Sequence, residues 1–97
     1  MYIIENLEIS DDIIELNWDE AIALIKDPVE KNNPFRLPTK AELNLMYTHK
    51  DELDLVSNIY WSSEEYDDKC AFALFSSGIL NGWFKEFNEM VRLVRSI

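Results

Sequence analysis

The apolar residues change their spacing in the second half of the chain, and this change limits the fold more than any other feature. In the first half, Trp18, Ala21 and Ile22 recur at the intervals of one helical face. In the second half, residues 70–75 form an almost unbroken apolar run, which is typical of a central strand covered on both faces. Helical segments followed by several strands predict an α+β fold. Ninety-seven residues are enough for one domain, which we expect to span 1–97.

Two short motifs indicate where the helices begin. Asn17 and Glu20 have the spacing of a capping box, in which each side chain hydrogen-bonds the backbone N–H of the other residue. Thr39 and Glu42 repeat this spacing with the more usual threonine. Pro28 predicts the end of the first helix, because the residue before a proline disfavours the helical conformation.

The remaining segments are predicted to be strands and turns. Glu8 alternates with apolar neighbours, a pattern that suits a half-buried strand. Asn81 and Gly82 form the pair that most often makes a two-residue hairpin turn. Residues 83–87 and 90–95 are expected to be two strands that follow this turn.

Three segments occur in a fixed order: residues 35–43 (FRLPTKAEL), 60–64 (YWSSE) and 91–95 (VRLVR). They are similar to the WRLPTxxEL, YWSST and VRCVR segments of the bacterial C-type-lectin-like domain at the C-terminus of collagen-like proteins of the Lcl type. The resemblance covers about residues 17–96, and Phe35 and Leu93 stand where the family often has Trp and Cys. It implies a C-type-lectin-like α+β fold with two helices packed on a twisted antiparallel sheet. It implies little about function, because this fold displays many kinds of site.

No catalytic or metal-binding motif is complete in the sequence. Sugar-binding lectins of this fold hold calcium with carboxylate-bearing tripeptides, and the nearest match, residues 33–35, has no carboxylate. The acidic residues 64–68 are the alternative source of calcium ligands. Cys70 and His49, the single cysteine and the single histidine, cannot build a structural zinc site. We therefore expect no enzyme activity, no cofactor and no metal.

The charge pattern carries the functional prediction. The chain has 19 Asp and Glu residues against 9 Lys and Arg residues, which gives a formal net charge of −10. This balance argues against direct nucleic-acid binding, which requires a clustered basic surface. The acidic residues are dense near the N-terminus and in two later clusters. The candidate partner-binding residues in those clusters are Asp51, Glu52, Asp54, Glu64, Glu65, Asp67 and Asp68, with Tyr66 as the apolar anchor.

These clusters predict a non-catalytic protein-binding module. Its expected form is a small acidic inhibitor or decoy, of the phage or mobile-element type, that covers a basic and nucleic-acid-binding surface of a partner protein. The alternative prediction is a lectin-like domain that binds a glycan or another surface ligand. The N-terminal residues lack the basic region of a signal peptide, and no stretch approaches the ~18 apolar residues of a membrane span. A cytoplasmic location without membrane contact is therefore expected.

Overall fold

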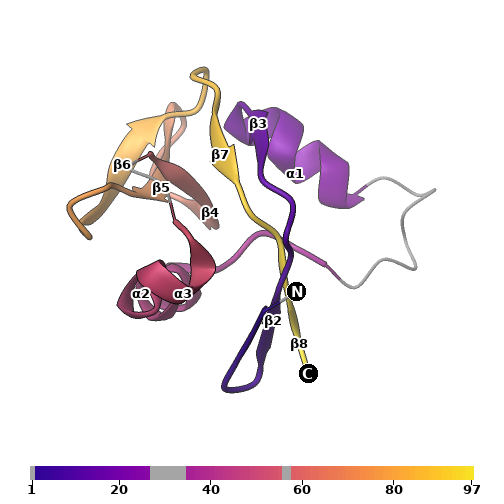
Figure 1. Cartoon of the computed structure of the whole chain (residues 1–97). Helices are drawn as coiled ribbons and strands as arrows, with labels where there is room; N and C mark the ends of the chain where they lie inside the picture. The colour runs from indigo at the N-terminus through magenta and orange to yellow at the C-terminus, as the bar shows by residue number, and fades with distance from the viewer. Residues whose placement is uncertain (1, 27–34, 56–57) are drawn as a thin grey trace.

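Short helices and strands make up an α+β fold, which Figure 1 shows in chain order. The computed structural model describes residues 2–26, 35–55 and 58–97. The helices in these ranges are α1 (Trp18–Lys26), α2 (Lys40–Thr48) and α3 (Lys50–Leu53). The strands are β1 (Tyr2–Ile4), β2 (Leu7–Ile9), β3 (Ile14–Leu16), β4 (Tyr60–Glu65), β5 (Cys70–Leu74), β6 (Leu80–Phe84), β7 (Glu89–Val91) and β8 (Val94–Ser96). The radius of gyration of 12.4 Å is close to the ~13 Å of a compact domain of 100 residues.

The strands form two sheets rather than the single antiparallel sheet that the sequence predicts. One sheet has the strand order β1-β2-β8, and the other has the order β3-β7-β4-β5-β6. All described pairs are antiparallel except β4 with β7, which is parallel. The smaller sheet exists because the N-terminal hairpin pairs with the C-terminal strand, as β2 and β8 do in Figure 1.

Both substantial helices begin at the predicted capping boxes. The backbone N–H of Glu20 donates to Asn17 Oδ1 at 2.8 Å, and that of Glu42 donates to Thr39 Oγ1 at 3.1 Å. The reciprocal bonds from each cap residue to the glutamate are 3.1 and 2.8 Å long. The helix end predicted at Pro28 lies outside the described residues. The short helix α3 was not predicted, and it buries Leu53 completely.

We expect Thr39→Ala to lower the free energy of unfolding by about 0.5–2 kcal/mol, because it removes the side-chain acceptor at the start of α2. Thr39→Ser, which keeps the hydroxyl, is the matched control and should stay close to wild type. Chemical denaturation followed by circular dichroism measures both variants. Equal midpoints for the alanine variant and the wild type would contradict a stabilising role of this cap.

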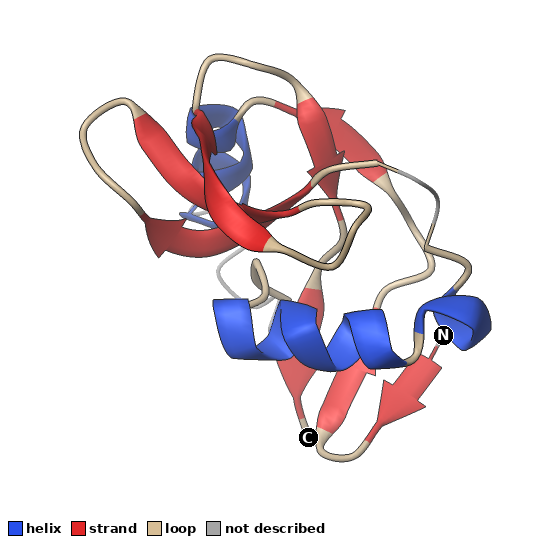
Figure 2. Cartoon of the chain, turned by 90° about the vertical axis from the view of Figure 1, so that its left-hand side faces the viewer, coloured by secondary structure: helices blue, strands red, loops and turns tan. Residues whose placement is uncertain are grey.

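The core lies on both faces of β4 and β5. Tyr60 and Trp61 are neighbours in β4 and are 2% and 0% exposed, and they belong to different hydrophobic clusters. Tyr60 packs with residues of α2, α3 and the three-stranded sheet, whereas Trp61 packs with Ala21 of α1 and Val91 of β7. Figure 2 shows α2 between the five-stranded sheet above it and the three-stranded sheet below it. The strand alternation thus directs two adjacent aromatic rings into opposite layers.

The hairpin turn predicted at Asn81 and Gly82 is wrong. Both residues lie inside β6, where they pair with Ala73 and Phe72. The turn between β5 and β6 comes earlier, where Gly78 has a φ of +89° and donates its N–H to the Phe75 carbonyl. The predicted strand 83–87 is also wrong in part, because β6 ends at Phe84 and a turn follows.

Two further predictions at the ends of the chain are corrected. The predicted strand 90–95 is divided between β7 and β8, which belong to different sheets. Glu8 is 2% exposed and does not lie on the solvent side of a half-buried strand. Its carboxylate is buried because Arg95, opposite it on β8, pairs with it.

Candidate functional site

Most positive charges of the described residues are engaged within the molecule. Arg36 donates to both carboxylate oxygens of Glu42 at 2.6 and 2.7 Å, and this hydrogen bonding lowers the pKa of Glu42. Arg95 pairs with Glu8, and the buried Arg92 donates to two backbone carbonyl oxygens. Three lysine ammonium groups lie over aromatic rings: Lys40 over Phe72, Lys50 over Tyr47 and Lys85 over Trp18. Exposed carboxylates therefore dominate the charge that an approaching protein would meet.

The acidic loop predicted at residues 64–68 is a loop only from Tyr66 onwards, because Glu64 and Glu65 are the last residues of β4. Most carboxylates of this segment hold its own structure. Glu64 accepts a hydrogen bond of 2.7 Å from the backbone N–H of Lys40, at the start of α2. Glu65 Oε2 lies 2.5 Å from Lys85 Nζ. Asp67 accepts from the backbone N–H groups two and three residues later, at 2.8 and 2.7 Å. These three acids therefore have structural partners, and a charge reversal of the whole loop would disturb the fold as well as the surface.

The predicted anchor Tyr66 is 54% exposed, but one side of its ring is covered. The ring meets Phe72 edge to face, with 5.1 Å between the ring centroids. It also lies over Gly82, where an added Cβ would come within 3.0 Å of Tyr66 Cγ. This close approach explains a glycine in the middle of β6.

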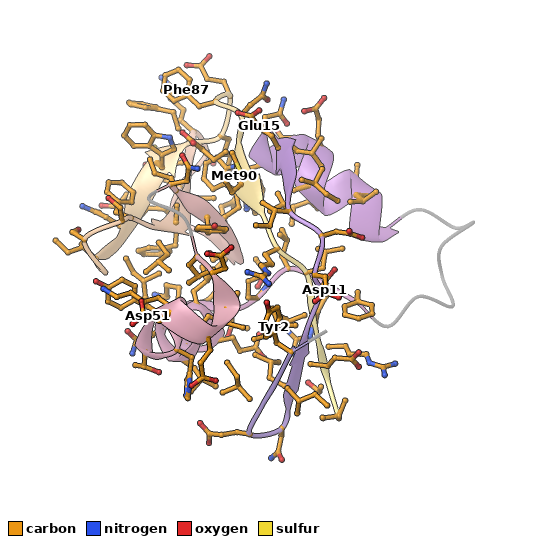
Figure 3. The ribbon with its side chains drawn as sticks, in the orientation of Figure 1. Tyr2, Asp11, Glu15, Asp51, Phe87 and Met90 are labelled. Carbon is orange, nitrogen blue, oxygen red and sulfur yellow. The ribbon has the colours of Figure 1, made fainter. Side chains whose placement is uncertain are left out.

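The second predicted cluster, Asp51, Glu52 and Asp54, belongs to a different part of the surface. These residues lie on α3 and at its end, where Asp54 adopts a φ of +55°. Glu52 Oε1 is 3.3 Å from His49 Nδ1. Figure 3 shows Asp51 well away from Phe87, which follows β6. The structure does not bring the two predicted clusters together.

Around Phe84 the structure assembles a group of residues that sequence reasoning missed. A depression of about 540 Å³ is lined by Asp19, Asp68, Lys69, Phe84, Lys85 and Glu86. We call Asp19, Asp68, Phe84, Glu86 and Phe87 the Phe84 surface. Asp19 comes from the first turn of α1, so the N-terminal acidic cluster meets the acidic loop here. Their exposed carboxylates and the exposed Lys69 share this depression with the Phe84 side chain, which is 47% exposed.

Lys85 lies beneath these acids and contributes little positive charge to the surface. Its side chain is only 12% exposed, and its ammonium group bonds Glu65 and the carbonyl oxygen of Asp68, the latter at 3.1 Å. The hydrogen bond from Lys85 to Glu65, together with the attraction of Asp19 and Asp68, raises the pKa of Lys85. Lys85 is thus a fixed counter-charge within the acidic group.

The exposed rings of the Phe84 surface rest on a rigid aromatic cluster. The Phe84 and Phe87 ring centroids are 5.8 Å apart, and each ring contacts Trp83. Trp83 is fixed in turn because its indole N–H donates to Glu89 at 2.8 Å. Phe87 is 44% exposed. The sequence signal was the pair of phenylalanines beside Glu86, but it was hidden because residues 83–87 were expected to be one strand.

A second depression of about 250 Å³ lies between α2, α3 and the ends of β4 and β5. Its walls combine aromatic rings with polar groups. They include Tyr47, Tyr60 and Phe75 together with Lys50, Asp51, Asn58 and Ser76. Asp51 is the only residue of the predicted clusters that lines it within the described part of the chain.

Groups of metal-binding side chains do not gather at either depression in the described part of the chain. Across residues 2–26, 35–55 and 58–97, no three His, Cys, Asp or Glu side chains are placed to hold a metal ion. Partial burial, together with the nearby Asp67 carboxylate, raises the pKa of the Cys70 thiol, which disfavours the reactive thiolate. No described helix has the length and apolar character that a membrane crossing requires.

Comparisons with known protein families and curated sequences identify no relative of this chain. No protein-family model matches the chain, and no curated protein sequence matches it.

Proposed function

We propose that the chain is a non-catalytic protein-binding module whose Phe84 surface covers a basic surface of a partner protein. The observation that carries this proposal is the grouping of Asp19, Asp68 and Glu86 around an exposed phenyl ring. Two lysines line the same depression: Lys85 is paired with Glu65, whereas Lys69 is exposed and has no ion-pair partner among the described residues. The three carboxylates therefore outnumber one available ammonium group. Protein interfaces commonly combine a central apolar residue with a polar rim.

The carboxylates and the phenylalanines of the Phe84 surface contribute differently to binding. Each exposed ion pair with the partner would contribute only ~0.2–1 kcal/mol, and salt would screen it. The carboxylates therefore act mainly on the rate and the direction of approach. Most of the affinity would come from burying Phe84 and Phe87, because large aromatic side chains dominate the binding energy of interfaces.

The proposed form of this activity is a small acidic inhibitor or decoy acting in the cytoplasm, of the phage or mobile-element type. A surface that binds nucleic acid presents clustered Lys and Arg side chains to phosphates. Exposed carboxylates offer the same side chains an alternative set of negative oxygens. The chain would thus compete with nucleic acid for the partner, and it would not bind nucleic acid itself.

We also propose that the fold is C-type-lectin-like, as the sequence resemblance implies. Two observations support this proposal. Thr39, in the first of the three resembling segments, caps α2, and Trp61, in the second, is a fully buried core residue. Residues that shape a fold in this way are those that a distant family would share.

A glycan is the second candidate ligand, and one observation favours it. Three aromatic rings line the smaller depression together with the polar groups of Asp51, Asn58 and Ser76. This mixture suits a sugar ring, which has apolar faces and hydroxyl groups. Retention on a column of immobilised sugars, lost in Asp51→Ala, would support this candidate over the acidic binder.

The charge proposal is tested by reversing three carboxylates whose side chains have no hydrogen-bond partner among the described residues. We expect Asp19→Lys with Asp68→Lys and Glu86→Lys to slow capture of a basic partner by at least about tenfold at about 0.1 M ionic strength. The partner is a protein that binds the immobilised wild-type chain, is rich in Lys and Arg, and is released by duplex DNA. Biolayer interferometry measures the association rate.

The matched control reverses the acids of the other cluster, Asp51, Glu52 and Asp54, and changes the net charge by the same amount. At the same ionic strength this control should slow association by less than about threefold, because charges farther from the contact than the Debye length of ~10 Å act weakly on the approach. Equal rates in both triple variants would mean that total charge, and not the Phe84 surface, drives capture. Unchanged rates in both would exclude the proposed function.

A further inference from the structure

β6 is the outer strand of the five-stranded sheet, and its far edge is open. Among the described strands it pairs with β5 alone, and it lies at the outside of the molecule in Figure 1. The N–H of Lys85 donates to the carbonyl of Lys69, and the N–H of Phe75 donates to that of Ile79, each at 2.9 Å. Hydrogen-bonded pairs alternate along an antiparallel ladder. The residues between them, Leu80, Gly82 and Phe84, therefore direct their backbone groups away from β5.

Most of these outward groups have no hydrogen-bond partner in the described part of the chain. The N–H of Gly82 donates to the side chain of the preceding Asn81 at 2.8 Å, and the carbonyl of Phe84 accepts from Phe87 at 3.2 Å. The N–H and carbonyl of Leu80, the carbonyl of Gly82 and the N–H of Phe84 remain open. These backbone groups all point away from β5, and they recur at every second residue, as pairing with an added strand requires.

The side chains along this edge indicate what would pair with it. Ile79 and Phe84, which bracket the edge, are 59% and 47% exposed. At the Phe84 end the edge runs into the carboxylates of Asp19, Asp68 and Glu86. In an antiparallel pairing of two copies, the Phe84 end of one strand would lie beside the Ile79 end of the other, so the acidic groups would not meet directly. The repulsion between two chains that each carry a net charge of −10 nevertheless opposes that pairing. An extended segment that carries Lys or Arg has the complementary charge.

We propose that β6 is the site where the partner adds a strand: an extended basic segment of the partner hydrogen-bonds to Leu80, Gly82 and Phe84. Main-chain bonds to an open sheet edge supply affinity, and side chains at alternate positions supply specificity. Ile79 and Phe84 are five positions apart and so lie on opposite faces of the strand. Lys or Arg side chains at alternate positions of the segment reach the Phe84 surface, while the apolar side chains between them pack beside Ile79. This inference rests on the proposed function and assigns the backbone element that the partner contacts.

The probe is a nine-residue peptide in which lysine alternates with valine. Its control has the same charge, but prolines replace two inner valines and prevent strand pairing. In the free protein, the amides of Leu80 and Phe84 should exchange with solvent at least about tenfold faster than those of Asn81 and Trp83, which bond β5. The alternating peptide should slow exchange at Leu80 and Phe84, and the proline peptide should bind at least about tenfold more weakly. Nuclear magnetic resonance measures exchange and chemical-shift changes in one sample.

Two variants at one position separate the backbone contact from the ring. Phe84→Ala removes the ring and keeps the open N–H, whereas Phe84→Pro removes both and breaks no bond to β5. We expect the proline variant to bind the alternating peptide about fivefold more weakly than the alanine variant, the effect of one hydrogen bond. The amide spectrum shows that each variant is folded before it is used.

The outcomes distinguish this inference from the proposed function. If both peptides bind equally and salt weakens both, the acidic surface binds basic segments but no strand is added, and the inference is wrong. If neither peptide shifts any amide of the Phe84 surface, the proposed function is wrong as well. If edge amides become protected at raised protein concentration without peptide, a second copy is the occupant, and the inference is again overturned.

Discussion

Trp61→Ala is expected to lower the free energy of unfolding by about 3–5 kcal/mol, the range for truncating a large buried aromatic side chain. Trp61 is 0% exposed, and its ring fills the layer between β4 and α1. Its indole N–H donates to the carbonyl of Leu16 at 3.1 Å, so the substitution also leaves a carbonyl of β3 without this donor. The total free energy of unfolding of a small domain is only about 5–15 kcal/mol, so the variant should be close to unfolding at physiological temperature. Urea denaturation followed by tryptophan fluorescence and circular dichroism gives the value.

Phe87→Ala is the matched control, because it also removes an aromatic ring but from a side chain that is 44% exposed. Its cost should be less than half that of Trp61→Ala, since a half-exposed ring loses less buried apolar area. Similar midpoints for the two variants would show that Trp61 is not the centre of its cluster.

Arg95→Ala has the second-largest expected effect, a loss of about 2–4 kcal/mol, because it leaves a buried carboxylate without its counter-ion. Glu8 is 2% exposed, and its Oε2 atom has no hydrogen-bond partner among residues 2–26, 35–55 and 58–97, so Arg95 is its principal compensation. The pair joins β2 to β8 and thus ties the two ends of the chain together. The full cost of a wholly buried pair is about 3–5 kcal/mol, and solvent access to Arg95 reduces it here.

The control for this pair is the double variant Glu8→Leu with Arg95→Leu. Replacing both charges by apolar side chains of similar shape should recover most of the lost stability, because no buried charge then remains uncompensated. A double variant as unstable as Arg95→Ala would contradict the assignment of the cost to the buried carboxylate of Glu8. Thermal melting of the three proteins side by side gives the comparison.

The sequence predicts elements whose determinants are local. Both capping boxes involve residues three positions apart, and the structure confirms both. The apolar run 70–75 is confirmed as an inner strand of its sheet, although Cys70 and Phe72 are only half-buried. In each case the pattern and the interaction lie within one segment, where side-chain spacing alone carries the information.

Elements that depend on distant residues were not predictable from one segment. Glu8 is buried because of Arg95, which is 87 positions away. Gly82 leaves room for the ring of Tyr66 and does not form a turn. Tertiary packing therefore overrides the local hairpin signal. The Phe84 surface escaped prediction for the same reason, since Asp19 and Asp68 meet only after α1 packs beside the end of β6.

The candidate acidic clusters also combine a local feature that the sequence shows with a tertiary feature that it does not show. Charge counting found the acidic loop and the α3 acids, but it could not show which carboxylates the fold uses for itself. Glu64, Glu65 and Asp67 have intramolecular partners, and Asp68 keeps an exposed carboxylate at the Phe84 surface. Whether an acid is available to a partner depends on which backbone N–H groups and lysines the fold brings to it.

The central claim, that carboxylates of the Phe84 surface steer a basic partner, is tested most directly by the salt dependence of association. The rate constant for capture of the DNA-displaceable partner is measured by stopped-flow between low and high ionic strength, for the wild type and for the triple reversal of Asp19, Asp68 and Glu86. We predict that the wild-type rate falls by at least about tenfold as salt screens these charges, and that the reversal removes most of this dependence. A wild-type rate that does not change with salt, or a reversal with the same slope as the wild type, would contradict it.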